Sequence, residues 1–154
     1  MKYVKLQFLL ILCLSVLTMT VMAANSNKEK GDAFRAKNKL KKGVKVLANG
    51  MQYEVLSTGK GAKPKITDKV TVHYHGTLVD GTVFDSSVKR GVPATFPVNR
   101  VIKGWQIILP MMTEGSKWRV VIPPELAYGS RGAGRLIGPD TTLIFEIEIF
   151  SIDK

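Results

Sequence analysis

The chain has very little of what covalent and metal chemistry require. It contains one cysteine, Cys13, and two histidines, His73 and His75, among 154 residues. A single cysteine allows no disulfide within the chain, so packing alone must hold the fold. The two histidines stand at i and i+2 of a predicted strand and share a face, but no cysteine, aspartate or glutamate is placed nearby to complete a ligand set. We therefore expect neither a metal nor a cofactor.

Motifs for nucleophilic and phosphate chemistry are also missing. There is no Gly-x-Ser-x-Gly elbow and no phosphate-cradling loop of the Walker type. The glycines at 129, 132 and 134 follow a predicted loop instead of a strand, which argues against dinucleotide binding. Acid–base chemistry by Asp85 and Glu125 is conceivable, but no sequence feature links the two. A reaction by this protein would therefore depend on binding and environment.

One long uncharged run occurs, at the N-terminus. Lys2 and Lys5 precede residues 6–24, which are apolar and end in small side chains. This order is typical of a cleaved signal peptide, and we predict one over residues 1–24. The alternative is an uncleaved anchor, because about 20 apolar residues suffice to cross a bilayer. We expect export, with membrane contact only through an uncleaved signal.

Acidic residues are scarce, with 12 against 23 basic ones. Removing Lys2 and Lys5 leaves 21 basic residues and a net charge of +9. Basic proteins often bind nucleic acid, but an exported protein does not meet it, and we expect no such partner. Residues 25–49 are rich in lysine; we predict a flexible lead-in at 25–30 and a short basic helix at 32–42. Its lysines form either a solvated face or a surface that docks onto an acidic one.

Residues 50–154 carry mainly strand patterns. Alternating apolar and polar positions predict strands at 51–57, 68–79, 82–85, 94–96, 116–122 and 141–152, separated by turns. One apolar helix at 101–109 must cover the sheet, because a lone sheet face needs a partner layer. Residues 86–93 and 125–140 read as loops, and the second is long enough to suggest function. The fold class is α+β: an antiparallel, five- to six-stranded curved sheet wrapped around one short α-helix.

Aromatic and branched apolar residues gather beside the predicted turns. They are Tyr74, Phe84, Phe96, Val101, Ile102, Trp105, Tyr128 and Phe145. Trp105, on the single helix, is either the main core residue or the floor of a pocket. Core packing explains Trp118, Ile122, Leu143 and Ile147, but Phe84 and Tyr128 lie where a core residue is not required. Asp85 is either a turn residue or the partner of a buried tyrosine hydroxyl.

Five ordered blocks resemble the FKBP-type peptidyl-prolyl cis-trans isomerases. They are Val-His-Tyr-His-Gly at 72–76, Asp-Gly-Thr-Val-Phe-Asp-Ser-Ser at 80–87, Val-Ile-Lys-Gly-Trp at 101–105, Pro-Pro-Glu-Leu-Ala-Tyr-Gly at 123–129 and Leu-Ile-Phe-Glu-Ile-Glu at 143–148. The resemblance covers residues 50–154, which would form the isomerase domain. The preceding basic helical extension, residues 25–49, resembles a shortened N-terminal region of the exported bacterial subgroup that includes the macrophage infectivity potentiators. This resemblance implies export to the periplasm or outer-membrane surface of a bacterium.

The resemblance implies an enzyme that accelerates rotation about X–Pro bonds without covalent chemistry. Trp105 would form the floor of an apolar pocket, with walls from Tyr74, Phe84, Phe96, Val101, Ile102 and Phe145. The backbone N–H of Ile102 and the hydroxyl of Tyr128 would hold substrate carbonyls, and Asp85 would hydrogen-bond Tyr74. Ile137 would belong to the apolar loop tip that overhangs the pocket. Asp85, Ile102 and Tyr128 are thus the predicted catalytic residues, and the others bind substrate.

The implied partners are proline-containing polypeptides and the macrolide inhibitors of the family, and we expect a monomer. Two other functions stay open: a non-catalytic proline-peptide-binding chaperone that uses the same pocket, and a host-interaction protein that depends on its basic helix. Deletion of residues 25–43 should leave activity on small peptides nearly unchanged if the helix is only an appendage.

Overall fold

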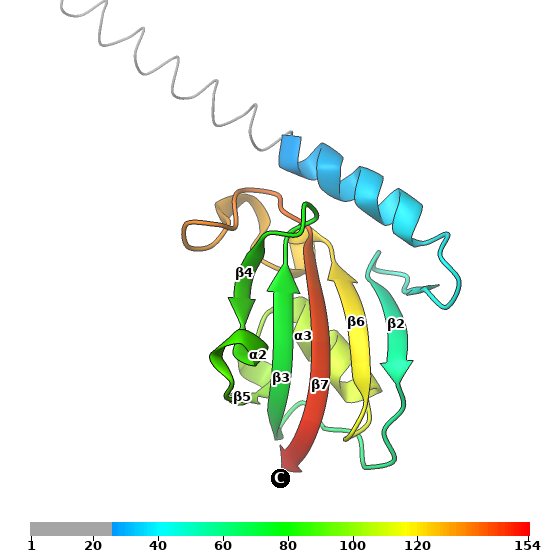
Figure 1. The fold of residues 1–154 in the computed structure, drawn as a ribbon, viewed down its shortest axis with the longest axis vertical. Helices are drawn as coiled ribbons and strands as arrows, with labels where there is room; N and C mark the ends of the chain where they lie inside the picture. The colour runs from blue at the N-terminus through cyan, green and yellow to red at the C-terminus, as the bar shows by residue number, and fades with distance from the viewer. Residues whose placement is uncertain (1–25) are drawn as a thin grey trace, which may run out of the picture.

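The computed structural model describes residues 26–154, and the predicted signal peptide lies outside them. The described residues form one antiparallel sheet of seven strands in the order β1-β2-β6-β7-β3-β4, with β5 also paired to β3 (Figure 1). The strands are β1 (Lys45–Val46), β2 (Gln52–Ser57), β3 (Lys69–Thr77), β4 (Val83–Ser86), β5 (Ala94–Pro97), β6 (Lys117–Ile122) and β7 (Leu143–Asp153). Among these residues no helix has both the length and the apolar character needed to cross a bilayer.

The α+β class is confirmed, with seven strands where five or six were expected. The additional strands have a simple origin. The long strand β3 pairs with β5 through Lys69–Val72 and with β4 through His75–Thr77 on the same side, while β7 occupies its other side. At the opposite edge of the sheet, the two-residue β1 pairs with the start of β2.

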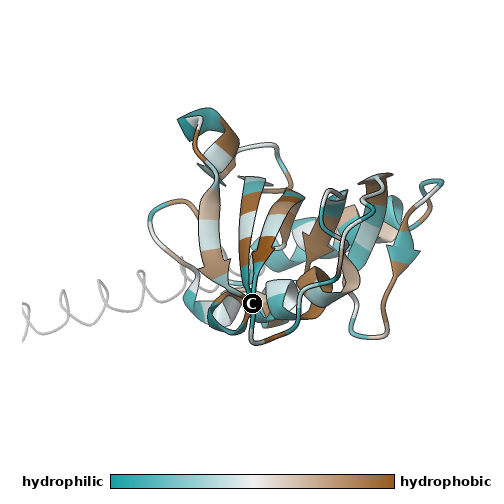
Figure 2. Ribbon diagram, turned by 90° about the horizontal axis from the view of Figure 1, so that it is seen from below, coloured by the Kyte–Doolittle hydropathy of each residue, from teal (hydrophilic) through white to brown (hydrophobic). Residues whose placement is uncertain are grey.

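The core lies between the inner face of the sheet and α3 (Lys103–Ile108). Alternation along the central strands produces this face, and bands of opposite hydropathy follow one another along the strands in Figure 2. Its fully buried members include Val70, Val72, Val120, Ile122, Leu143, Ile147 and Ile149. Gly104 lets α3 approach β6 closely, because a Cβ there would lie 2.6 Å from Ile122 Cγ2.

The helix predicted at 101–109 is divided into three pieces. A 3₁₀ turn, η1 (Val98–Arg100), precedes α3, and a second, η2 (Leu109–Met111), follows it. Val101 and Ile102 are extended between η1 and α3. The chain therefore enters α3 from an extended dipeptide, which leaves these two residues at its N-terminal end.

A second helix, residues 26–38, packs on the outer face of the sheet. The helix predicted at 32–42 is present but ends at Asn38, and the flexible lead-in predicted at 25–30 was wrong, because the helix already includes residue 26. Gln52 Nε2 donates to Arg35 O at 2.8 Å, and Asn38 Nδ2 donates to Gln52 Oε1 at 2.9 Å. Gly31 lies against Thr142, where a Cβ would come within 2.3 Å of Thr142 Oγ1.

The outer face under this helix is buried without joining the main core. Gln52, Val121 and Ile144 are neighbours across β2, β6 and β7, with exposed fractions of 3%, 1% and 5%. None of them belongs to the inner hydrophobic cluster. The helix thus completes the domain, since it covers a patch of sheet that would otherwise face water.

Both predicted loops contain short helices. Within 86–93, α2 (Ser87–Arg90) begins after Ser86, whose side chain accepts from Lys89 N, and ends at Gly91 in the left-handed region. The region 125–140 contains η3 (Pro124–Leu126) and η4 (Gly129–Arg131). Trp118 is only partly buried and stacks on Tyr53 with ring centroids 4.7 Å apart, at the margin of the core instead of within it.

Candidate active site

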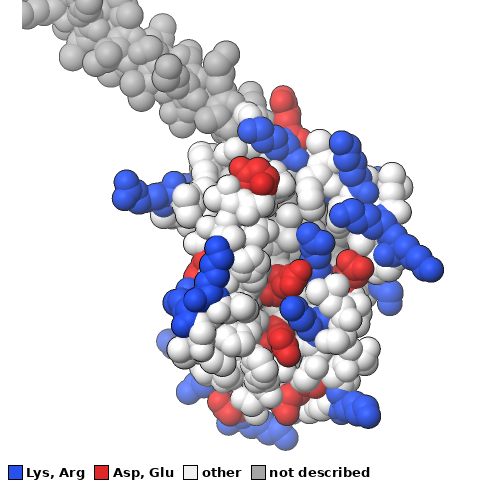
Figure 3. Space-filling view, viewed as in Figure 1, with Lys and Arg blue, Asp and Glu red and all other residues white. Residues whose placement is uncertain are grey.

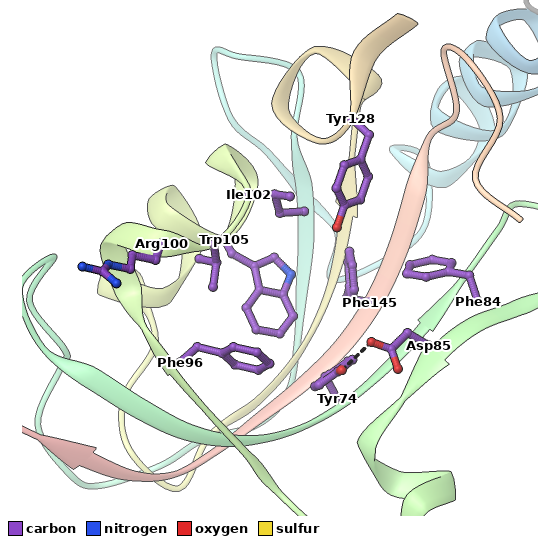
Figure 4. Close-up of a pocket in the computed structure, with 10 residues that line it drawn as sticks. Tyr74, Phe84, Asp85, Phe96, Arg100, Ile102, Trp105, Tyr128 and Phe145 are labelled. Atoms are coloured by element: carbon purple, nitrogen blue, oxygen red, sulfur yellow. Dashed lines mark hydrogen bonds between the residues drawn. The ribbon is translucent and has the colours of Figure 1, made fainter. Parts of the chain in front are cut away.

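One cavity of about 450 Å³ opens on the inner side of the sheet, beside the N-terminal end of α3 (Figure 4). Strands β3, β4, β5 and β7, the entry to α3 and the loop between η3 and η4 all contribute to its wall. Its lining residues are Tyr74, Phe84, Asp85, Phe96, Arg100, Val101, Ile102, Trp105, Tyr128 and Phe145. Nine of the ten residues predicted for the site therefore surround this one cavity.

Trp105 lies at the base of the cavity and is 4% exposed. Three rings meet it edge-on: Tyr74 at 5.5 Å, Phe96 at 5.8 Å and Phe145 at 5.3 Å between centroids, with interplanar angles of 82°, 89° and 78°. Edge-to-face pairs of this kind are favoured by the ring quadrupoles, and each ring restricts its neighbours. Phe84 extends the cluster through Phe145 at 5.4 Å. The result is a fixed apolar floor.

A polar pair closes one side of this floor. Tyr74 Oη donates to Asp85 Oδ2 at 2.5 Å, as the dashed line in Figure 4 shows. Arg90, which does not line the cavity, donates to Asp85 Oδ1 and also to Tyr74 Oη, the latter at 2.9 Å. Its guanidinium lies over the Tyr74 ring, 5.6 Å from the centroid. The carboxylate is therefore neutralised from outside the pocket while its hydrogen bonds fix the tyrosine.

The ionisation of this group follows from its surroundings. Burial opposes the charge on Asp85, but the hydrogen bonds from Tyr74 and Arg90 and the charge of Arg90 outweigh it and lower the pKa of the carboxyl. Burial and the hydrogen bond to Asp85 raise the pKa of the Tyr74 phenol. At neutral pH Asp85 is therefore a carboxylate and Tyr74 is a neutral phenol. Neither side chain is suited to donate a proton to a substrate at this pH.

Arg90 was missed in the sequence, although a signal for it exists. A serine side chain can cap the first turn of a helix, and Ser86 accepts from Lys89 N in this way. The resulting turn of α2 returns the chain so that Arg90 meets Asp85, five residues earlier. Gly91 and Pro93 predict a loop at 86–93, and a helix of four residues is too short to show helical periodicity.

Two further polar groups face the cavity. Ile102 is extended at the start of α3 and its carbonyl accepts from Trp105 N and Gln106 N, while its own N–H has no acceptor among residues 26–154. Tyr128 is 41% exposed, and its hydroxyl points into the cavity in Figure 4. Both residues line the cavity, and each has a hydrogen-bond donor without a partner among residues 26–154.

Ile137 and Arg100 differ from expectation. Ile137 does not line the cavity: it is 8% exposed and belongs to the core. Its amide and carbonyl pair with Ala133 in a tight bridge, and its neighbour Leu136 is 51% exposed instead. Arg100 also lines the cavity, although no sequence feature had selected it, because η1 ends at this residue directly before Val101.

The two histidines lie on the opposite face of the sheet. His73 Nδ1 is 3.0 Å from Ser87 Oγ, and His75 Nδ1 is 2.9 Å from Ser86 Oγ. The expectation that no carboxylate stands near them was wrong, because β7 pairs Glu148 with His73 and Glu146 with His75. Even so, no three such side chains within residues 26–154 form a group able to hold a metal ion.

Comparison with known proteins agrees with this fold. The family model for FKBP-type peptidyl-prolyl cis-trans isomerase matches residues 60–150, and the model for the domain amino-terminal to it matches residues 17–55. The chain belongs to the FKBP-type peptidyl-prolyl cis-trans isomerase family.

Its curated relatives include the peptidyl-prolyl cis-trans isomerase Mip of Coxiella burnetii, 55% identical over 128 residues, and the outer membrane protein MIP of Legionella longbeachae, 54% identical over 131 residues. These alignments cover 83% and 85% of this chain but only 56% of either relative. The chain thus spans little more than half the length of the curated relatives it matches.

Solved structures show the same fold. A crystal structure of FkpA from Escherichia coli matches 99% of this chain and 71% of its own, with 39% identity and a TM-score of 0.90. A peptidyl-prolyl cis-trans isomerase from Pseudomonas syringae matches 85% of this chain and 96% of its own, with 42% identity and a TM-score of 0.78. That share of this chain is about as long as residues 26–154, so a chain of about this length has the same fold in that relative.

Proposed function

We propose that this protein catalyses cis–trans isomerisation of X–Pro bonds in exported polypeptides, with the proline ring seated on Trp105. The observation that carries the proposal is the cavity of about 450 Å³, floored by fixed aromatic rings and lined by no cysteine, serine, histidine or lysine. A site of this composition is suited to bind an apolar ring. Its one carboxylate, Asp85, is already bonded to Tyr74 and Arg90, which leaves it poorly placed to attack a substrate.

The uncatalysed reaction is slow because rotation breaks amide resonance, with a barrier of about 18–20 kcal/mol. The twisted amide has less charge separation than the planar one, so an apolar site stabilises it relative to the planar ground state, which water solvates better. Lowering the barrier by about 8 kcal/mol corresponds to an acceleration of about a millionfold. The aromatic floor and walls supply the environment for this effect.

Polar groups at the rim hold the peptide while its bond turns. The free N–H of Ile102 and the hydroxyl of Tyr128 are the donors available to substrate carbonyls. Asp85 positions the Tyr74 ring and places negative charge at the side of the pocket, where Arg90 balances it. Restraining the two flanks of an X–Pro bond in this way favours rotation over dissociation.

A protease-coupled assay with a proline tetrapeptide tests the proposal, with the full chain added in increasing amounts. The rate constant for cis-to-trans conversion should rise linearly with protein concentration. Trp105→Ala should remove most of the increase, while Trp118→Ala, which lies outside the pocket, should retain it. No increase with the unchanged chain, under conditions in which its fold is verified, would refute the enzymatic proposal.

Macrolide inhibitors of the family are proposed to occupy the same cavity. They should compete with the tetrapeptide and quench the fluorescence of Trp105, and Trp105→Ala should abolish competition. Binding of proline peptides without acceleration would instead favour a non-catalytic chaperone. Export is supported by the uncharged segment at residues 6–24 and is tested by the intact mass of the protein recovered from outside the cytoplasm.

A further inference from the structure

The turn that follows the first helix combines dense positive charge with exposed apolar side chains. This lysine turn, residues 37–46, contains five lysines and no acidic residue. Leu40 in its centre is 80% exposed, more than any other large hydrophobic residue among residues 26–154, and Val46 is 52% exposed. Lysine side chains gather at this end of the helix in Figure 3.

The turn is held in place and is not a frayed helix end. Backbone hydrogen bonds join Leu40 N to Lys37 O at 3.2 Å, Lys41 N to Asn38 O at 3.0 Å and Val44 N to Lys41 O at 3.2 Å. Asn38 is buried and bonded to Gln52, which anchors the start of the turn to the sheet. Leu40 is therefore directed into solvent by an ordered backbone, although a buried position would be more favourable for its side chain.

The charge of the turn is not balanced within the described part of the chain. None of its lysines forms a salt bridge among residues 26–154. Glu54 lies beside Gly43 on the sheet side but forms no salt bridge with these lysines. Lys45 Nζ lies 5.9 Å from the Tyr53 ring centroid. By contrast, Lys28 and Arg35 of the preceding helix both pair with Asp32.

We propose that the lysine turn docks on an anionic phospholipid surface, with Leu40 inserted among the headgroups and the lysines bound to phosphates. A bilayer complements both the lysines and Leu40, because it is anionic at its surface and apolar just beneath. A soluble polyanion would satisfy the lysines alone. The cavity is lined by other elements, so the pocket stays open to client polypeptides while the turn is docked.

Vesicle co-sedimentation of residues 26–154 tests this inference, because it separates the turn from the apolar segment at residues 6–24. Binding is measured on phosphatidylcholine alone and on phosphatidylcholine mixed with phosphatidylglycerol. Each lysine near an anionic surface strengthens binding by on the order of fivefold. The triple variant Lys39→Ser, Lys41→Ser, Lys42→Ser should thus bind the mixed vesicles about a hundredfold more weakly, and Leu40→Ser about tenfold more weakly.

A matched control removes equal charge elsewhere. Lys60, Lys63 and Lys65 are exposed in the loop between β2 and β3, at the other end of the sheet. Their triple replacement by serine should retain most of the binding. All variants should keep the isomerase activity of the unchanged protein on tetrapeptides, which verifies that they are folded.

Three outcomes would overturn the inference. Equal loss in the two triple variants would show that only net charge matters. Unchanged binding by Leu40→Ser would indicate a polyanion site without insertion. A dimer in sedimentation velocity that Leu40→Ser dissociates would show that the turn contacts a second copy of the chain instead.

Discussion

Replacing Asp85 by asparagine is the sharpest single perturbation of the pocket. Asparagine has nearly the same shape but carries no charge, and it keeps one acceptor oxygen. The carboxylate accepts from Tyr74 at 2.5 Å and from Arg90, so the variant weakens both bonds and leaves Arg90 without its counter-ion. The floor made by Trp105 is untouched.

The expected loss of stability depends on how far the Asp85 side chain is exposed to solvent. A hydrogen bond to a charged group contributes about 1.5–3 kcal/mol when buried. The Asp85 side chain is 45% exposed, so solvent screening reduces this to about 1 kcal/mol for each bond. The free energy of unfolding should fall by about 1–2 kcal/mol. The value of kcat/KM should fall about five- to thirtyfold if the same interactions orient the pocket in the transition state.

A double-mutant cycle with Tyr74→Phe measures how Asp85 acts. The protease-coupled assay gives kcat/KM for the wild type, each single variant and the double variant, and urea unfolding gives their stabilities. If Asp85 acts by positioning Tyr74, the second replacement should cost less than twofold in the Tyr74→Phe background. Asp80→Asn, an exposed turn variant, is the control and should be near wild type. Equal losses in both backgrounds would refute the positioning role.

Three further predictions concern the walls, the helix and pH. Gly76→Ala places a Cβ within 2.6 Å of the Phe84 ring; it should push that ring into the cavity, raise KM and weaken macrolide binding, as measured by kinetics and calorimetry. Gly31→Ala meets Thr142 Oγ1 at 2.3 Å; it should lower the free energy of unfolding by about 1 kcal/mol with tetrapeptide activity retained, and a drop in activity would contradict a purely structural role for the helix. Because folding lowers the pKa of Asp85, its contribution is fully present above the unfolded pKa of about 3.9 and is lost as pH falls below it. The difference in melting temperature between wild type and Asp85→Asn should thus be constant near neutral pH and shrink in acid.

The sheet could be predicted because its signal is local. Residues 145–149 alternate between buried apolar and partly exposed acidic positions, and β3 has the same alternation of burial along nine residues. The pocket could be predicted for a different reason: the resemblance supplied which distant residues meet, and nine of the ten do line one cavity. Periodicity alone did not decide whether Trp105 is a core residue or the floor of a pocket.

The errors share a physical cause, since each concerns a feature decided by individual side-chain or turn contacts instead of by hydrophobic periodicity. The helix of residues 26–38 has only a thin apolar stripe, and its extent depends on packing against Gln52 and Thr142. Arg90 reaches the site only through the serine-capped turn of α2. Ile137 is turned into the core by its bridge to Ala133. None of these contacts leaves a periodic trace in the sequence.

Exchange NMR on a proline peptide is the measurement that tests the central claim most directly. It observes cis and trans forms at equilibrium, without a protease, in the presence of a small amount of the protein. The uncatalysed exchange takes tens to hundreds of seconds. We predict that the exchange time becomes shorter than one second and that the peptide perturbs the signals of Trp105. Perturbed Trp105 signals with exchange left at its uncatalysed rate would contradict it, because the pocket would then bind proline without turning the bond.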